Sequence, residues 1–136
     1  MLPTPEASLG AHRRDYGQPP EVRRAGGHSV STADVARGIS DAGGDWGPYA
    51  AAITRWEAVT GRPAPAPVRH DGKGDKPRLN PEFTEWMMGW PAGWVTAPAI
   101  GLTRAGQLKA CGNGCVPQQV VGALSILWPR VLEQAS

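Results

Sequence analysis

Apolar side chains recur at three- and four-residue spacing in several stretches, and this period predicts amphipathic helices. The predicted helices begin at Ser31, Asp45, Asn80, Thr103 and Pro117. Polar residues such as Ser, Asp and Asn at these starts can cap a first helical turn. Glycine ends the first four segments, and a proline is expected to interrupt the last. These residues are Gly43 with Gly44, Gly61, Gly89, Gly112 and Pro129. The pattern predicts a mainly α fold with irregular loops, and a short β element near residues 93–96 or in the first forty residues.

Two of these helices differ in how much apolar surface they carry. The helix after Asn80 has one apolar face, which is predicted to be core, made by Phe83, Trp86, Met87 and Trp90. The helix after Pro117 is apolar well beyond a single stripe, at Val120, Val121, Ala123, Leu124, Ile126, Leu127 and Trp128. A helix of that kind needs to be buried on several sides. The preceding 116 residues offer little to bury it, so the pattern predicts a missing partner surface.

Glycine and proline, at 18 and 14 residues of 136, are concentrated in the first part of the chain and in a linker. Residues 1–30 show no periodicity and are predicted to form an extended loop, and residues 62–77 have the composition of a linker. We therefore divide the chain into a Pro/Gly-rich segment, 1–77, with one or two helices, and a helical region, 78–136.

The net charge of +2 does not by itself indicate a nucleic-acid partner. The basic residues are nevertheless grouped, and six of them are candidate phosphate contacts: Arg13, Arg14, Arg23, Arg24, Lys73 and Lys76. Their alternative role is a solvated surface. Motifs for a nucleophile elbow, a P-loop or a dinucleotide site are missing. Without a signal-like start or a membrane-length apolar run, a cytoplasmic location is expected.

Two cysteines, Cys111 and Cys115, flank Gly112, Asn113 and Gly114. A zinc site is not expected, because zinc needs four ligands and the histidines are far away in sequence. Nor is the spacing that of a Cys-x-x-Cys redox pair. Cys111 is predicted to be a small core residue. The loop between the cysteines can present amides and an Asn side chain to a small ligand, or it can be a simple turn between helices.

Two stretches together resemble motifs of the DNA (cytosine-5) methyltransferases of phages and bacteria. Arg78-Leu79-Asn80-Pro81, followed by Trp86 to Pro91 (WMMGWP), resembles their ninth motif, with Asn80, Glu82-Phe83 and Trp90 as departures. The stretch QLKACGNGCVPQQVVGAL resembles their tenth motif. The opening LPTPEAS resembles, more weakly, the start of a recognition segment.

The resemblance implies that this chain is an incomplete part of a larger α/β methyltransferase in a bacterium or phage-infected host. Asn113 and Gly114 would line the S-adenosylmethionine pocket, and the last helix would pack on a catalytic domain. Arg78 would organise the recognition region, with double-stranded DNA as a partner. The family's Pro-Cys nucleophile is absent, so no catalytic residue is assigned, and activity would need a separate catalytic methyltransferase chain.

Two alternatives remain open at this point. One is a stand-alone, non-enzymatic DNA- or protein-binding module derived from such an enzyme, which the good helix caps favour and the apolar last helix disfavours. The other is an inactive remnant that is mostly disordered before residue 45.

Overall fold

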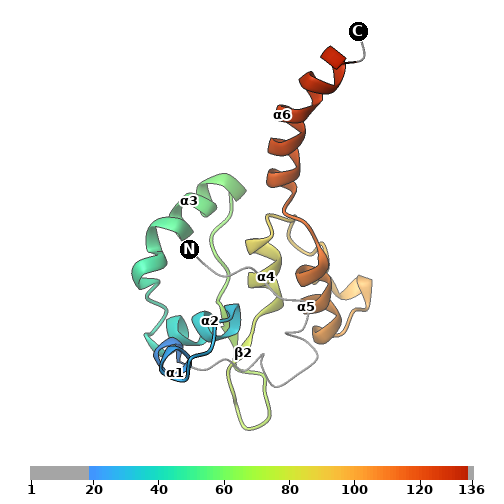
Figure 1. Cartoon of the computed structure of the whole chain (residues 1–136). Helices are drawn as coiled ribbons and strands as arrows, with labels where there is room; N and C mark the ends of the chain where they lie inside the picture. The colour runs from blue at the N-terminus through green and yellow to red at the C-terminus, as the bar shows by residue number, and fades with distance from the viewer. Residues whose placement is uncertain (1–18, 135–136) are drawn as a thin grey trace.

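A computed structural model describes residues 19–134 of the chain. It is mainly helical, as the apolar pattern predicts, and the described residues also contain a small antiparallel sheet (Figure 1). The elements are α1 (Pro20–Ala25), α2 (Thr32–Asp41), η3 (Gly47–Tyr49), α3 (Ala50–Thr60), β1 (Val68–Arg69), β2 (Arg78–Leu79), α4 (Pro81–Met87), η4 (Pro98–Ile100), α5 (Arg104–Asn113) and α6 (Pro117–Gln134).

Three predicted helix starts are confirmed by their hydrogen bonds. At α2, the hydroxyl of Ser31 accepts from the amide of Asp34 at 3.3 Å, and the Asp34 carboxylate accepts from the amide of Ser31 at 2.8 Å. The Asn80 side chain accepts from the amide of Glu82 at 3.1 Å and caps α4. The Thr103 hydroxyl caps α5 by accepting from the amide three residues later at 3.2 Å. Each bond satisfies an amide that the helix itself leaves unpaired.

A first correction concerns the early part of the chain. Residues 20–25 form α1, although this stretch is predicted to be loop, and α2 is largely buried, so the hypothesis of disorder before residue 45 is wrong for residues 19–44. The helix α1 is only six residues long, too short to show periodicity. A tertiary ion pair holds it, since Arg23 Nε lies 3.3 Å from Asp34 Oδ2.

A second correction concerns the strands. The predicted linker contains β1 and begins the hairpin, in which Val68 pairs with Leu79 and Arg69 with Arg78. Residues 93–96, where a strand was expected, form turns. The amides of Gly93, Val95 and Thr96 bond to the side chain of Glu85, and that of Trp94 bonds to the carbonyl of Pro91. Strands of two residues leave no alternation in the sequence, so pattern alone does not locate them.

A third correction concerns the ends of the last two helices. The helix α5 runs through Gly112 to Asn113, and α6 continues through Pro129. Pro129 removes one backbone hydrogen bond, to the carbonyl of Ser125. Because α6 is exposed, water can reach that carbonyl, and the helix tolerates the proline.

The core lies where α2, α3, the hairpin, α4 and α5 converge. Its buried side chains are Ala33, Ala36, Ile53, Val68, Leu79, Phe83, Trp86 and Leu108. A smaller cluster of Met88, Val95 and Cys111 lies between α4, the loop after it and α5. Each of α2, α3, α4 and α5 contributes buried residues to these clusters, but α6 contributes none.

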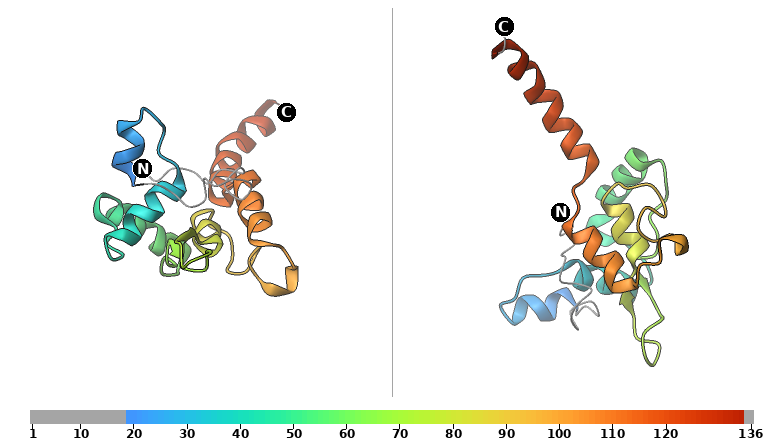
Figure 2. Two further views of the ribbon diagram at one scale, coloured as in Figure 1. Left: turned by 90° about the horizontal axis from the view of Figure 1, so that it is seen from below. Right: turned by 90° about the vertical axis from the view of Figure 1, so that its right-hand side faces the viewer.

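The helix α6 extends away from the rest of the described chain (Figures 1 and 2). It has no buried residue. Its large apolar side chains are 41–63% exposed, and they are Val120, Val121, Leu124, Ile126, Leu127, Trp128, Val131 and Leu132.

Candidate functional site

The candidate site is the junction where the loop after α4, the end of α5 and the start of α6 meet. It brings together the two stretches that carry the family resemblance. Trp90 Nε1 donates to the carbonyl of Cys115 at 3.0 Å, and Gln118 Nε2 donates to the carbonyl of Gly89 at 3.3 Å. These two bonds join residues 25 and 29 positions apart, so the contact is tertiary.

Gly114 is required by this contact for steric reasons. Its φ of −82° is open to any residue. A Cβ at this position would, however, lie 2.2 Å from Cζ2 of Trp90. Only the missing side chain lets the indole ring cover the backbone here.

The buried carboxylate of Glu85 fixes the loop after α4. Glu85 is 2% exposed. Its oxygens accept from the amides of Gly93 at 2.7 Å, Val95 at 2.8 Å and Thr96 at 3.0 Å, and from the Thr96 hydroxyl at 3.2 Å. A buried carboxylate needs several donors to offset lost hydration, and this loop supplies them. The loop therefore leaves α4 in a fixed direction and holds Trp94 outward, 62% exposed.

A second set of bonds supports Trp90 from the α3 side. The Arg62 guanidinium donates to the carbonyl of Trp90. Trp86 Nε1 donates to the carbonyl of Arg62 at 3.3 Å, and Trp56 Nε1 donates to that of Trp86 at 2.9 Å. Sequence analysis missed both Glu85 and Arg62, since their partners are backbone atoms that no spacing pattern reveals.

The two predicted cofactor residues lie at the rim of the junction. Asn113 is the last residue of α5 rather than part of a free loop, and Gly114 follows it. Both are exposed. They could contact a small ligand placed beside Trp90.

Cys111 has the predicted role of a core residue. Burial raises the pKa of its thiol to about 11, an effect opposed by a hydrogen bond with Thr84 and reinforced by the nearby Glu85 carboxylate. The thiol therefore stays protonated near neutral pH and is a poor nucleophile. Cys115 is exposed, and the two cysteines are free rather than bridged.

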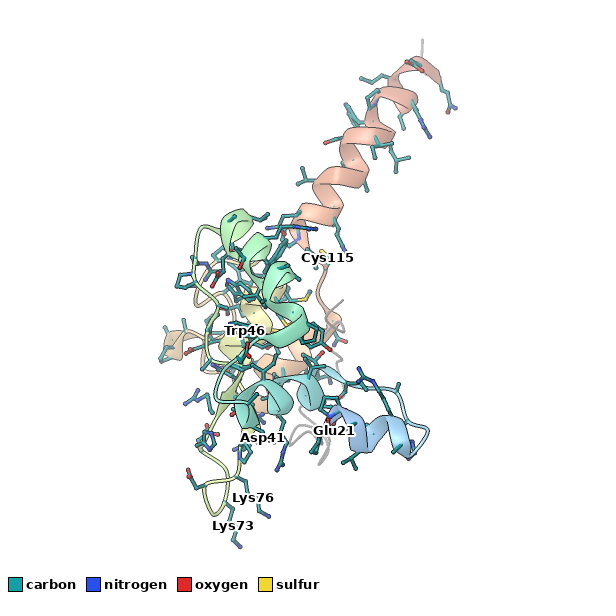
Figure 3. The ribbon with its side chains drawn as sticks, turned by 90° about the vertical axis from the view of Figure 1, so that its left-hand side faces the viewer. Glu21, Asp41, Trp46, Lys73, Lys76 and Cys115 are labelled. Atoms are coloured by element: carbon teal, nitrogen blue, oxygen red, sulfur yellow. The ribbon has the colours of Figure 1, made fainter. Side chains whose placement is uncertain are left out.

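The predicted phosphate contacts are distributed over different elements. Lys73 and Lys76 extend from the hairpin loop, at the end of the molecule far from Cys115 (Figure 3). Both lysines are exposed, as is Arg24 on α1. Arg23 instead pairs with Asp34. Arg13 and Arg14 lie outside the described residues.

Arg78, the predicted structural residue, lies in β2. Its Nη1 is 3.9 Å from Asp71 Oδ1. Its side chain also passes over Gly72, where a Cβ would come within 3.0 Å of Arg78 Cδ. In this chain Arg78 therefore shapes the hairpin loop that carries the two lysines.

Residues 19–134 contain no group of three or more His, Cys, Asp and Glu side chains that could hold a metal ion. In the same range, no helix is both long and apolar enough to cross a membrane. Comparison with protein-family models, with curated proteins and with solved structures found no match for this chain.

Proposed function

We propose that this chain is the C-terminal segment of an S-adenosylmethionine-dependent DNA cytosine methyltransferase. It would contribute DNA contacts and one edge of the cofactor pocket, and a separate catalytic chain would supply the nucleophile. The resemblance of residues 78–91 and 107–124 to the family's last two motifs is the starting point. The observation that carries the proposal further is the exposed apolar face of α6.

The face of α6 has the form of a surface made for a protein partner. At 100° per residue, seven of its large apolar side chains fall within an arc of about 140°, and only Ile126 lies outside. An arc of that width is typical of a helix packed on a globular core. The helix has only two charged residues, Arg130 and Glu133, of opposite sign. A basic polar face, as expected for a helix lying on an anionic membrane, is therefore absent.

The junction at Trp90 supports the proposal from a second side. It fixes Asn113 and Gly114 directly before α6, with Trp90 donating to the carbonyl of Cys115. If α6 packs on a catalytic domain, the same contact carries the amides and the Asn113 side chain to that domain. In this arrangement they would border a cofactor bound there.

A reconstitution assay tests the proposal. The chain is mixed with the catalytic region of a cytosine-5 methyltransferase that ends before its ninth motif, and transfer of a labelled methyl group from S-adenosylmethionine to duplex DNA is measured. We expect transfer with the wild-type chain, and a loss of at least tenfold with Leu124→Glu, because a charge on the apolar face opposes docking. Gln119→Glu, on the polar side of α6, is the matched control and should retain transfer.

The proposal is wrong if the wild-type chain neither supports methyl transfer nor binds duplex DNA. It also fails if Leu124→Glu and Gln119→Glu support transfer equally, since α6 would then not be the docking surface.

A second candidate function is a stand-alone DNA- or protein-binding module. The observation that favours it is the position of the core, which is built by residues from α2 to α5 without any contribution from α6. In that case the isolated chain would bind DNA with steep salt dependence, because phosphate contacts release counterions, and a catalytic region would add nothing.

A further inference from the structure

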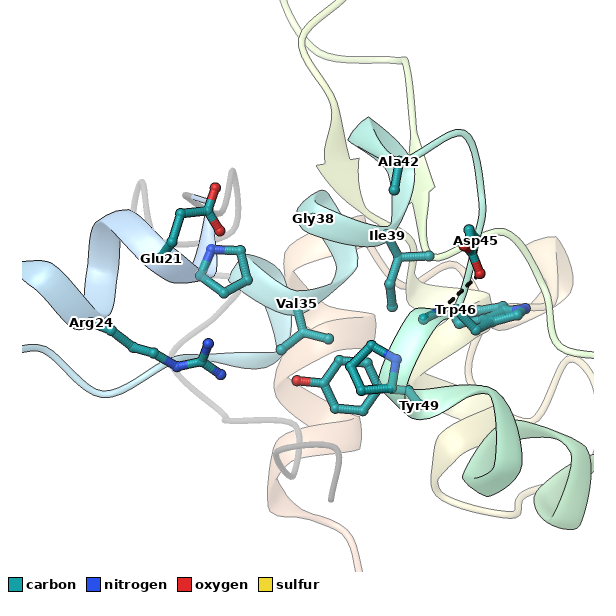
Figure 4. A pocket seen from close by; sticks show the side chains of 12 residues that line it. Glu21, Arg24, Val35, Gly38, Ile39, Ala42, Asp45, Trp46 and Tyr49 are labelled. Carbon is teal, nitrogen blue, oxygen red and sulfur yellow. Dashed lines mark hydrogen bonds between the residues drawn. The ribbon is translucent and has the colours of Figure 1, made fainter.

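A pocket of about 300 Å³ lies between α1, α2 and the turn before α3, far in sequence from the junction. Its lining includes Pro20, Glu21, Arg24, Val35, Ile39, Trp46 and Tyr49 (Figure 4). Its size is at the lower end of the range for small-molecule sites.

The floor and one wall of the pocket are built by close packing of two helices. Val35 and Ile39 of α2, 3% and 5% exposed, form an apolar floor. Gly38 lets α1 approach, since a Cβ there would lie 3.0 Å from Cδ of Pro20. The ion pair between Arg23 and Asp34 holds the two helices together. The pocket is thus part of the folded structure rather than a gap between loose segments.

The opposite wall consists of aromatic rings. Trp46 stacks on the buried Phe83, with ring centroids 5.8 Å apart, so its position is fixed by the core. The ring of Tyr49 lies at the edge of the pocket (Figure 4). Asp45 accepts a hydrogen bond from the amide of Gly47 at 2.9 Å and thereby shapes this turn.

Polar groups converge at one side of this apolar space. In Figure 4 the guanidinium of Arg24 and the hydroxyl of Tyr49 point toward each other across Val35. Within residues 19–134, no hydrogen bond or ion pair engages the side chain of Arg24 or the Tyr49 hydroxyl. The two groups offer N–H and O–H donors suited to an anion, and Glu21 at the rim offers an acceptor.

We propose that this pocket binds one nucleotide unit of single-stranded DNA. The base lies against the Tyr49 ring, above the largely covered Val35 and Ile39, and its phosphate accepts from Arg24 and the Tyr49 hydroxyl. Aromatic contact and a nearby cation are the usual elements of single-strand recognition. A carboxylate such as Glu21 is the kind of acceptor that pairs with the exocyclic amine of cytosine. The inference rests on the DNA-binding part of the proposed function and adds a site for an unstacked base.

Tryptophan fluorescence tests this inference on the full chain. The probes are deoxycytidine monophosphate, a short single-stranded oligodeoxycytidine, its duplex with oligodeoxyguanosine, and inorganic phosphate. We expect quenching by the mononucleotide and the single strand. Arg24→Gln should weaken single-strand binding about tenfold and Tyr49→Phe about fivefold, because the first loses a bond between two charged groups and the second a bond from a neutral hydroxyl to the charged phosphate. Arg55→Gln removes an exposed positive charge from α3 outside the pocket and should have little effect.

The outcomes separate the pocket from the wider proposal. Equal weakening by Arg24→Gln and Arg55→Gln would indicate general charge attraction and would overturn the pocket inference, while leaving DNA binding intact. Binding of inorganic phosphate as tightly as the mononucleotide would also overturn it, because the base would contribute nothing. Duplex binding that depends on Lys73 and Lys76, without single-strand binding, would support the proposed function and reject the pocket.

Discussion

Individual side chains with buried polar atoms determine the geometry of the junction. Glu85 is the clearest case, since one carboxylate satisfies three loop amides and a hydroxyl. The Cys111 thiol lies close by. Burial excludes water from both side chains, so the thiol stays neutral and the Glu85 carboxylate requires protein donors. Both residues hold α4, α5 and the connecting loop in one arrangement.

Replacing Glu85 by Gln tests this role. The amide side chain keeps one acceptor oxygen but turns an NH2 group toward backbone amides, so buried donors lose their partner. We expect a loss of about 2–3 kcal/mol in the free energy of unfolding. Urea denaturation followed by tryptophan fluorescence measures it. Glu82→Gln, on the exposed side of the same helix, should change the free energy by less than about 0.5 kcal/mol. Equal effects of the two variants would contradict the assigned role.

The raised pKa of Cys111 predicts resistance to thiol reagents. With a pKa of about 11 against an ordinary 9.0, its thiolate fraction at pH 8 is reduced roughly a hundredfold. In Cys115→Ser, the remaining thiol should react with iodoacetamide at least a hundredfold more slowly in the folded chain than in urea. The proton is bound more tightly in the folded state, so this thiol favours folding below pH 9 and loses that effect as pH rises toward 11. Fast labelling of the folded variant at pH 8 would be incompatible with burial.

At the scale of elements, the sequence predicted those helix starts that depend on hydrogen bonds between neighbouring residues. Asn80 identifies the start of α4 because its cap bond reaches only two residues along the chain. The strand at Arg78 could not be predicted in the same way, since its partner Arg69 lies across a loop that composition describes as a linker. The Trp90–Cys115 contact was equally hidden, because it joins residues 25 positions apart through a backbone carbonyl. A hydrogen bond between residues a few positions apart can be predicted from the sequence. A hydrogen bond between distant segments cannot.

Gly114→Ala tests the contact between α4 and the start of α6. The new Cβ would overlap the Trp90 ring, and either the ring or the backbone must move. We expect the free energy of unfolding to fall by about 1–3 kcal/mol, as for other overpacked sites, with a change in tryptophan fluorescence. Gly122→Ala, in the exposed middle of α6 with open space around it, should be neutral or stabilising by up to about 1 kcal/mol. If both variants behave alike, the close approach at Gly114 has no energetic consequence.

At the scale of the molecule, a self-contained body carries a helix that its core does not use. The clusters around Trp86 and Met88 are complete without α6. The eight large apolar side chains of α6 are 41–63% exposed, and contiguous exposed apolar surface is a common feature of interaction sites. The structure therefore combines a core to which α6 contributes no buried residue with an exposed apolar face on α6. Under the proposed function, this face would pack on the catalytic chain.

Deleting residues 117–136 tests whether the core folds without α6 and whether α6 carries the exposed apolar surface. The helix has no buried residue. The deletion removes the exposed side-chain bond from Gln118 to the carbonyl of Gly89 and the amide bonds of Gln119 and Val120 to the carbonyl of Val116. The shortened chain should thus keep its near-ultraviolet circular dichroism, apart from the signal of Trp128, and its free energy of unfolding should change by less than about 1 kcal/mol. Binding of a hydrophobic dye, which the full chain should show, ought to disappear with α6. A shortened chain without a cooperative thermal transition would mean that α6 completes the core, and its exposed face would then no longer argue for a partner.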